Sequence, residues 1–273
     1  MTTPNDDVRS IELEIEVPGT PEQVWEAIAT GPGIEAWFVP AEVEEHEGGK
    51  MAFDMGSGME EGGVVTAWDP PRRFVGEEEW PSEAGPPGRL ATEWIVEARG
   101  GGTCVVRLGS SLFGSGNWDD ELEQMREGWQ AFLRNLQLYL THFPGERCST
   151  ILVTGAATGS LDEGWAALTG ALGLDDAAVG ERTATTTAAG VPPLAGTVEL
   201  AGDTWKFHRL LLPRLDEPAP GAAFLFVYEW QGECHPSIHA YLFGDDAAAR
   251  AERDRPRWRA WMNEHFPVQE RAN

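Results

Sequence analysis

Hydrophobic and charged residues alternate near the start of the chain, which is the pattern of a strand with one buried face. Ile11, Leu13 and Ile15 are separated by glutamates, so one side of this strand is apolar and the other is charged. Thr20 and the proline after it supply an N-cap and a first helical position, and they predict a short helix. The Gly-Pro-Gly sequence at 31–33 ends this helix, and a second short helical stretch follows.

From residue 41 to residue 113, clusters of glycine and proline interrupt the chain at short intervals, and the segments between them are short and strand-like. Apolar residues then recur at helical spacing over about five turns. This stripe consists of Leu122, Met125, Trp129, Phe132, Leu133, Leu136 and Leu140. It predicts one long helix whose apolar side must be covered.

A strand, two short helices, about six antiparallel strands and one long helix follow one another in the order of the helix-grip fold. Four motifs along this order resemble those of the START-like (SRPBCC) superfamily, in the branch named after the activator of the heat-shock-protein ATPase. They are V-W-x-A-I at 24–28, I-x-x-W-F at 34–38, G-x-V-x-x-x-D-P-P at 63–71 and G-W-x-x-x-L-x-x-L at 128–136. The resemblance implies an α+β fold in which an antiparallel curved sheet wraps around a long C-terminal helix. It implies little about function, because one fold hosts many activities.

The second half of the chain repeats features of the first half in a shorter form. Residues 161–169 are similar to residues 21–29, and an H-F-P triplet occurs at both 142–144 and 265–267. Between its tryptophan and its histidine the second copy lacks 17 positions, roughly one hairpin.

We therefore predict two START-like helix-grip domains, 1–148 and 149–273, the second shorter and divergent. Pro256 should kink the last helix or start a fresh helical segment.

Residues 153–161 offer a competing interpretation, because they resemble the strand-turn-helix opening T-G-x-x-x-G-x-G of short-chain dehydrogenases. Leu161 stands where the last glycine is needed for close packing of helix and strand. No Tyr-x-x-x-Lys pair follows, and roughly 120 remaining residues are too few for that enzyme fold. No phosphate-binding loop motif occurs either, so we expect no cofactor.

The charge of the chain disfavours several partners. The net charge is −25, and residues 1–150 hold 28 acidic and 10 basic side chains. Nucleic acid and anionic membranes would be repelled, and no segment is apolar enough for membrane insertion. Solubility is the simpler explanation of this charge. The alternative is that a cationic protein partner docks on the glutamates at 42–47 or 77–79. Three dispersed cysteines and the lack of a signal peptide predict a cytoplasmic protein.

Few residues suggest catalysis or metal binding. His235 and His239 are four apart in an apparent strand, which separates them by about 13 Å, too far to share one metal ion. With His208 they could form a polar cluster, although ordinary surface or core positions fit them better. Glu93 and Arg107 lie on adjacent predicted strands and could pair across the sheet.

A nucleophile is not expected at Ser57, which lacks the G-x-S-x-G frame. The sequence therefore predicts no metal site and leaves the catalytic residues unknown.

Aromatic residues are frequent, with 12 Trp and 11 Phe, and several fall on inward-facing positions. Core packing explains many of them. The START-like resemblance implies, in addition, an apolar cavity between the sheet and the long helix. We expect its lining to include Trp37, Phe53, Met55, Trp68, Trp94, Trp129 and Phe132. Met51 and Met59 would add adaptable walls.

Three functional hypotheses remain. The first is binding of a hydrophobic or amphipathic small molecule in the cavity of the first domain. The second is an enzyme of the polyketide cyclase or dehydratase type, which would place Glu93, Arg107 or a histidine in the cavity. The third is a co-chaperone-like module that binds a protein, and it rests on the resemblance alone.

Overall fold

The computed structural model describes residues 7–55, 60–80, 88–114, 119–186, 190–202, 205–230 and 233–268. Within it the chain divides into two compact units, Met1–Gly145 and Glu146–Asn273. The boundary between these units lies three residues before the one expected from the sequence. Ser57 and Met59 lie outside the described residues.

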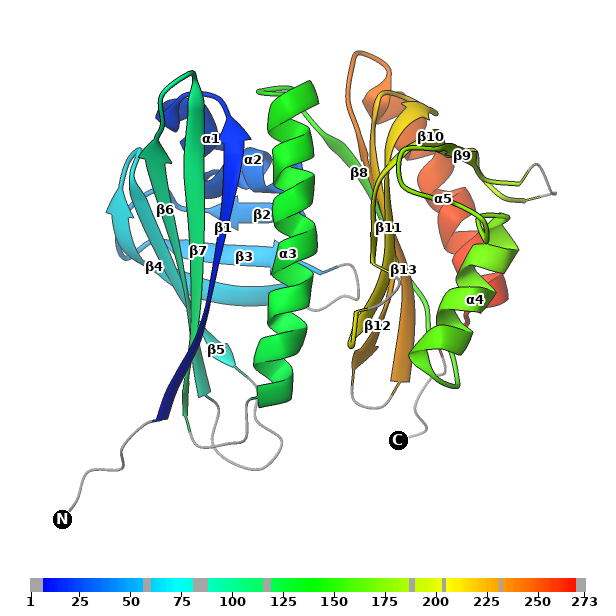
Figure 1. Ribbon diagram of the computed structural model, residues 1–273, viewed down its shortest axis with the longest axis horizontal. Helices are drawn as coiled ribbons and strands as arrows, with labels where there is room; N and C mark the ends of the chain where they lie inside the picture. Colours follow the sequence, from blue (N-terminus) through cyan, green and yellow to red (C-terminus); the bar gives the residue numbers. More distant parts are fainter. Residues whose placement is uncertain are drawn as a thin grey trace. The chain divides into compact units, whose positions relative to one another are not determined.

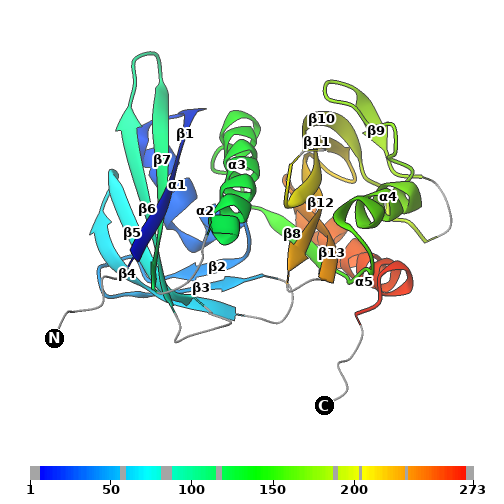
Figure 2. The ribbon, with the colours of Figure 1, turned by 60° about the horizontal axis from the view of Figure 1, so that its bottom comes forward.

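The first unit is an antiparallel sheet that curves around a long helix (Figures 1 and 2). The sheet order is β1-β7-β6-β5-β4-β3-β2. Its strands are β1 (Asp7–Pro18), β2 (Ala41–Val43), β3 (Lys50–Asp54), β4 (Glu60–Asp69), β5 (Arg73–Trp80), β6 (Gly88–Ala98) and β7 (Thr103–Gly114). Its helices are α1 (Pro21–Ala29), α2 (Gly31–Glu35) and α3 (Asp119–His142). The predicted helix-grip fold is confirmed.

Local sequence fixes the two short helices. Thr20 and Gln23 form a capping box at the start of α1, with the Gln23 Oε1 atom 2.9 Å from the Thr20 backbone nitrogen. Thr30 caps α2 through the backbone N–H of Gly33 at 3.1 Å. A Cβ atom at Gly33 would lie 1.9 Å from the backbone oxygen of Glu26, so only glycine allows α2 to pack this closely on α1.

The second unit repeats this plan on a smaller scale (Figure 1). Its sheet has the order β8-β13-β12-β11-β10-β9, so the first strand again pairs with the last. Its strands are β8 (Ser149–Thr154), β9 (Arg182–Ala184), β10 (Ala195–Gly202), β11 (His208–Glu217), β12 (Gly221–Trp230) and β13 (Glu233–Leu242), and its helices are α4 (Leu161–Leu172) and α5 (Ala247–His265). Every pairing is antiparallel, which is the helix-grip arrangement and not the doubly wound one.

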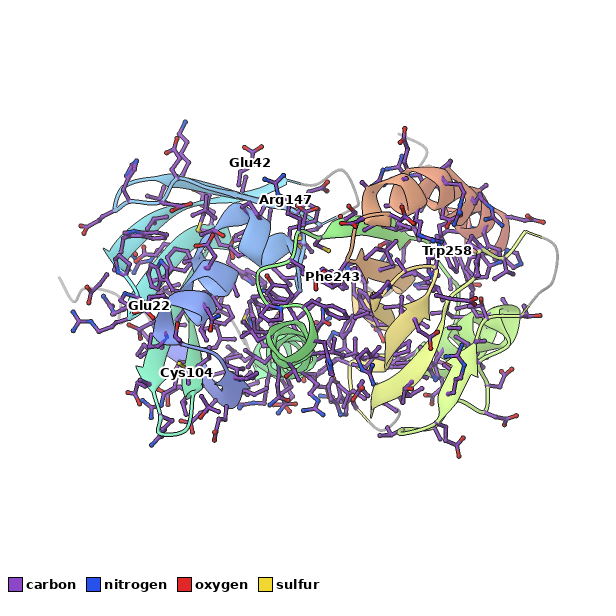
Figure 3. The ribbon with its side chains drawn as sticks, turned by 90° about the horizontal axis from the view of Figure 1, so that it is seen from above. Glu22, Glu42, Cys104, Arg147, Phe243 and Trp258 are labelled. Carbon is purple, nitrogen blue, oxygen red and sulfur yellow. The ribbon has the colours of Figure 1, made fainter. Side chains whose placement is uncertain are left out.

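The same local arrangement occurs before the first helix of both units. Gly19 (φ 123°) precedes α1 and Gly159 (φ 108°) precedes α4, and each is followed by a capping box. The buried thiol of Cys104 donates to the Gly19 oxygen at 3.4 Å, and that of Cys234 donates to the Gly159 oxygen at 3.3 Å. Burial raises the pKa of both thiols, and the charge of Glu22 adds to the effect at Cys104 (Figure 3). The same contact therefore ties the last strand to the residue before the N-cap of the first helix in each unit.

Within the described residues, the second unit differs from the first by one strand and one short helix, not by the predicted hairpin. Its sheet has 6 strands against 7, and no counterpart of α2 follows α4.

Of the two alternatives expected at Pro256, the fresh segment is wrong, because α5 is continuous from Ala247 to His265, and the kink stays a prediction. Trp258 and Ala251 are both buried on either side of this proline, and their burial offsets the lost hydrogen bond.

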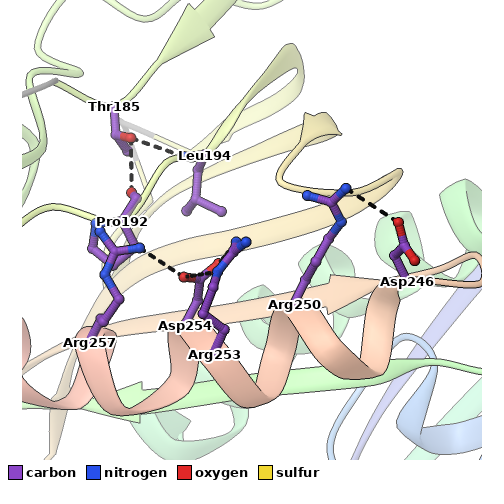
Figure 4. Close-up of polar contacts among 8 residues, drawn as sticks. All are labelled: Thr185, Pro192, Leu194, Asp246, Arg250, Arg253, Asp254 and Arg257. Carbon is purple, nitrogen blue, oxygen red and sulfur yellow. Dashed lines mark hydrogen bonds and ion pairs between the residues drawn. The ribbon is translucent and has the colours of Figure 1, made fainter.

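An ion-pair cluster lies on α5 next to this proline (Figure 4). Asp254 is 1% exposed and accepts hydrogen bonds from Arg253 and, at 2.9 Å, from Arg257. Burial alone would raise the pKa of Asp254, but the two guanidinium groups outweigh it and hold this pKa below its ordinary value. Asp254 is therefore charged, and its ion pairs with Arg253 and Arg257 compensate for its burial.

The three histidines do not form the polar cluster considered above. Strand β12 separates His208 on β11 from His235 on β13, and Tyr228 is the direct cross-strand partner of both. His239 is 4% exposed, and its ring meets that of Phe226 edge-on at 5.0 Å. Its Nδ1 atom is buried without a hydrogen-bond partner.

Burial lowers the pKa of His239 to about 3. The unfolded chain takes up this proton near pH 6.5, so between pH 6.5 and 3 the unfolded state holds more protons and the folded state loses stability as the pH falls. We expect this group to remove about 2 kcal/mol from the free energy of unfolding between pH 7.5 and 5. Urea unfolding at both pH values, compared with His239→Phe, measures it. An equal pH dependence in the variant would refute the assignment.

Candidate functional site

The first unit contains a cavity of about 170 Å³ between its sheet and its three helices. The walls come from β3, β5 and β6, from α1 and α2 with the turn after α2, and from α3. The lining residues are Ile28, Ile34, Trp37, Phe38, Met51, Phe53, Met55, Phe74, Gly76, Glu78, Trp80, Leu90, Thr92, Trp94, Met125 and Trp129.

A row of small side chains crosses the sheet next to this cavity. Gly76, Thr92 and Ser110 are direct neighbours on β5, β6 and β7. On one side of this row lie Phe74 and Trp94, which are also paired across β5 and β6. Gly76 leaves room for the Met51 side chain, because a Cβ atom at Gly76 would lie 2.5 Å from the Met51 Cε atom, and Thr92 lines the cavity beside it.

Three indole rings from the sheet, the turn after α2 and α3 line the cavity and pack against one another. Trp37 is 1% exposed, and its Nε1 donates to the Ala27 oxygen at 2.9 Å. Its ring meets Trp94 edge-on with centroids 5.8 Å apart, and Trp94 meets Trp129 edge-on at 5.5 Å. The buried Asn135 of α3 donates to the Trp37 backbone oxygen at 2.7 Å. These contacts fix the aromatic wall before any ligand arrives.

Two polar side chains interrupt the apolar lining. Glu78 of β5 and Thr92 of β6 are both half-buried. Among the described lining residues, Glu78 is the only ionisable one. An apolar cavity with few polar groups is the common form of a small-molecule site.

Five of the seven residues predicted as lining face the cavity, namely Trp37, Phe53, Met55, Trp94 and Trp129. The other two do not. Trp68 packs against Trp25 of α1 at 5.0 Å and against Phe74 at 5.6 Å. Phe132 lies behind Phe38, with ring centroids 4.6 Å apart. Their role in ligand binding stays a prediction without a contact to this cavity.

Sequence reasoning missed Glu78, Thr92 and Trp80, although alternation could have found them. Phe74, Gly76, Glu78 and Trp80 are two residues apart on β5, so they share the inward face. We did not assign Glu78 to the inward face, because the consecutive glutamates at 77–79 are typical of a solvated segment.

The predicted pairing of Glu93 with Arg107 is wrong. Glu93 meets Arg73 at 2.6 Å, and Arg107 meets Glu14 at 2.9 Å and Glu97 at 2.6 Å. Arg107 stands opposite Ile95 in the register, with Glu93 and Glu97 as its two diagonal neighbours, and it contacts the second. The hydrogen bond to Glu14, followed by that to Glu97, raises the pKa of Arg107. Neither Glu93 nor Arg107 lines the cavity.

The described residues show no group of three or more His, Cys, Asp or Glu side chains that could hold a metal ion. Within that same part of the chain, no helix is both long and apolar enough to cross a bilayer.

A curved antiparallel sheet closed by a C-terminal helix over an apolar cavity defines a START-like domain. Residues 18–141 match the family described as activator of Hsp90 ATPase homolog 1-like protein, and the first unit belongs to this family. No curated protein sequence matches the chain.

Several solved structures are similar to it. Protein MLL2253 from Mesorhizobium loti is 18% identical over 50% of this chain and 98% of its own, with a TM-score of 0.45. DynU16, a putative protein in the dynemicin biosynthetic locus, is 16% identical over 97% of each chain, with a TM-score of 0.43. The di-domain ARO/CYC BexL from the BE-7585A biosynthetic pathway is 14% identical over 96% of this chain and 100% of its own, with a TM-score of 0.44.

Proposed function

We propose that the first unit binds a hydrophobic or amphipathic small molecule in the cavity between its sheet and α3. The observation that carries this proposal is the apolar cavity of about 170 Å³ with its packed indole rings. Apolar cavities of about 150 Å³ stay dry and bind benzene, so one aromatic ring fits without rearrangement. Met51 and Met55 have flexible side chains that could move aside for a larger molecule.

Energetics support a ligand in this place. A bound apolar molecule would remove apolar lining and its own surface from water, which is favourable by roughly 25 cal/mol per Å².

Binding is favoured over catalysis of the cyclase or dehydratase type. That alternative needs an acid and a partner that stabilises charge inside the cavity. Glu93, Arg107 and the histidines are all absent from the described lining, where Glu78 is the only ionisable group. The protein-binding alternative rests on the family description alone. Three cysteines that form no disulfide fit a reducing cytoplasm.

Titration of the full chain with single-ring aromatics, aromatic polyketides, fatty acids and sterols tests the proposal. We expect a saturable change in tryptophan emission, because Trp37, Trp80, Trp94 and Trp129 line the cavity. The smallest rings should bind without delay, and larger molecules should require displacement of the methionine side chains. A panel in which no compound gives saturable binding would reject the proposal.

A further inference from the structure

Met51 forms one side of the cavity in the first unit. Its side chain is 6% exposed and lines the cavity from β3. The direct cross-strand neighbour of Met51 is Gly63 on β4, so both residues share the inward face of the sheet. A Cβ atom at Gly63 would lie 2.9 Å from the Met51 Cε atom, and one at Gly76 on β5 would lie 2.7 Å from the Met51 Sδ atom. The Met51 side chain therefore crosses β4 and ends against β5.

This placement explains why no residue of β4 occurs in the described lining. The sheet residues that line the cavity come from β3, β5 and β6, although β4 runs between β3 and β5. Gly63 faces inward but has no side chain, and the thioether of Met51 lies over it. Met51 therefore occupies space that would otherwise belong to the cavity.

Met51 can leave this position, whereas the indole rings are held in theirs. Methionine is unbranched and has three rotatable bonds, so its side chain adapts to the space around it. Trp37, in contrast, is held by the hydrogen bond from its Nε1 to the Ala27 oxygen and by its edge-on contact with Trp94. Displacing Met51 gives up its contacts with the two glycines, so a molecule that needs this space binds with a penalty.

The volume of the cavity decides which molecules need this space. An apolar cavity of about 150 Å³ holds one benzene ring, and the cavity of the first unit measures about 170 Å³. A second fused ring therefore exceeds the space available while Met51 covers Gly63.

We propose that Met51 is the specificity-determining residue of the cavity, because its side chain selects one-ring molecules over molecules with two fused rings. This inference rests on the proposed binding function and adds to it the residue that limits ligand size.

Benzene and naphthalene test this selection, because they differ by one fused ring and neither carries a polar group. Both are titrated into the full-length protein and into Met51→Ala, with calorimetry and tryptophan emission as readouts. The wild-type protein should bind benzene at least fivefold more tightly than naphthalene. In Met51→Ala the ratio of naphthalene affinity to benzene affinity should rise at least tenfold, because the space over Gly63 is then open without any displacement.

Gly76→Ala tests the same contact from the opposite side. The added methyl group would take the place of the Met51 Cε atom, so the Met51 side chain must turn into the cavity. We expect the affinity for benzene to fall at least tenfold in this variant. Adding Met51→Ala to Gly76→Ala should restore that affinity to within about threefold of the wild-type value.

Met262→Ala is the matched control. Met262 is a methionine of the second unit that is 1% exposed, and a Cβ atom at Gly155 would lie 2.9 Å from its Sδ atom. The variant therefore removes the same atoms from a similar contact far along the chain from the cavity. It should leave both affinities within about twofold of the wild-type values. Circular dichroism and thermal unfolding verify that each variant is folded.

Equal affinity of the wild-type protein for both compounds, or an unchanged ratio in Met51→Ala, would overturn this inference and leave the proposed binding function standing. A loss of benzene binding in Gly76→Ala that Met51→Ala does not restore would also overturn it. Binding of neither compound would overturn it as well, and the wider panel of polyketides, fatty acids and sterols would then decide on the binding function separately.

Discussion

Replacing Trp37 by alanine is expected to lower the stability of the first unit by about 3–5 kcal/mol, the range for a large-to-small change in a core. Trp37 is 1% exposed, it packs against Phe38 and Trp94, and its Nε1 atom donates to the Ala27 oxygen. The change therefore removes packing and leaves a buried carbonyl without its partner. Urea unfolding followed by circular dichroism measures the loss.

Trp129→Ala is the matched control for this prediction. Trp129 is half-buried because the cavity lies on one side of it. Its replacement should cost at least 1 kcal/mol less than that of Trp37, since fewer contacts are lost. If both variants were equally stable, or if Trp129→Ala were the less stable one, Trp37 would not be the fixed point of the aromatic wall.

Filling the cavity should abolish ligand binding while leaving the fold intact. Thr92 lies in the row of small side chains, with Gly76 and Ser110 as direct neighbours, so a phenyl ring at position 92 has room to enter the cavity. We expect Thr92→Phe to weaken binding of single-ring aromatics at least tenfold, a loss of about 1.4 kcal/mol or more. Its stability should be equal to or above that of the wild-type protein, because filling a cavity restores contacts.

Thr66→Phe is the corresponding change at an exposed position on β4. It should leave ligand affinity within about twofold of the wild-type value. Affinity that fell equally in Thr66→Phe and Thr92→Phe would show that the effect is not steric, and unchanged affinity in Thr92→Phe would place the ligand elsewhere.

Periodicity predicted the elements whose residues repeat a clear pattern. The alternation at Ile11, Leu13 and Ile15 forms β1, and the stripe from Leu122 to Leu140 lies on α3. The rule that proline interrupts a helix was less successful in the second unit. Pro256 does not begin a new segment, because tertiary packing on both sides of a proline can outweigh its local cost.

The cavity was predictable only in part, because alternation gives the face of a side chain but not its neighbours. Trp68 pairs with the inward-facing Phe74, yet Trp25 of α1 covers it. Phe132 is on the correct helix, but the ring of Phe38 lies in front of it. That Gly76 and Thr92 stand side by side in the lining follows from the strand register, which short sequence patterns do not specify.

Native mass spectrometry of the full-length protein purified from its own host, with Thr92→Phe prepared in parallel, tests the central claim most directly. The wild-type chain should carry an added mass of one small molecule that disappears on unfolding, and the chain with the filled cavity should not carry it. A bare wild-type chain, or the same added mass on Thr92→Phe, would contradict a ligand-binding cavity in the first unit.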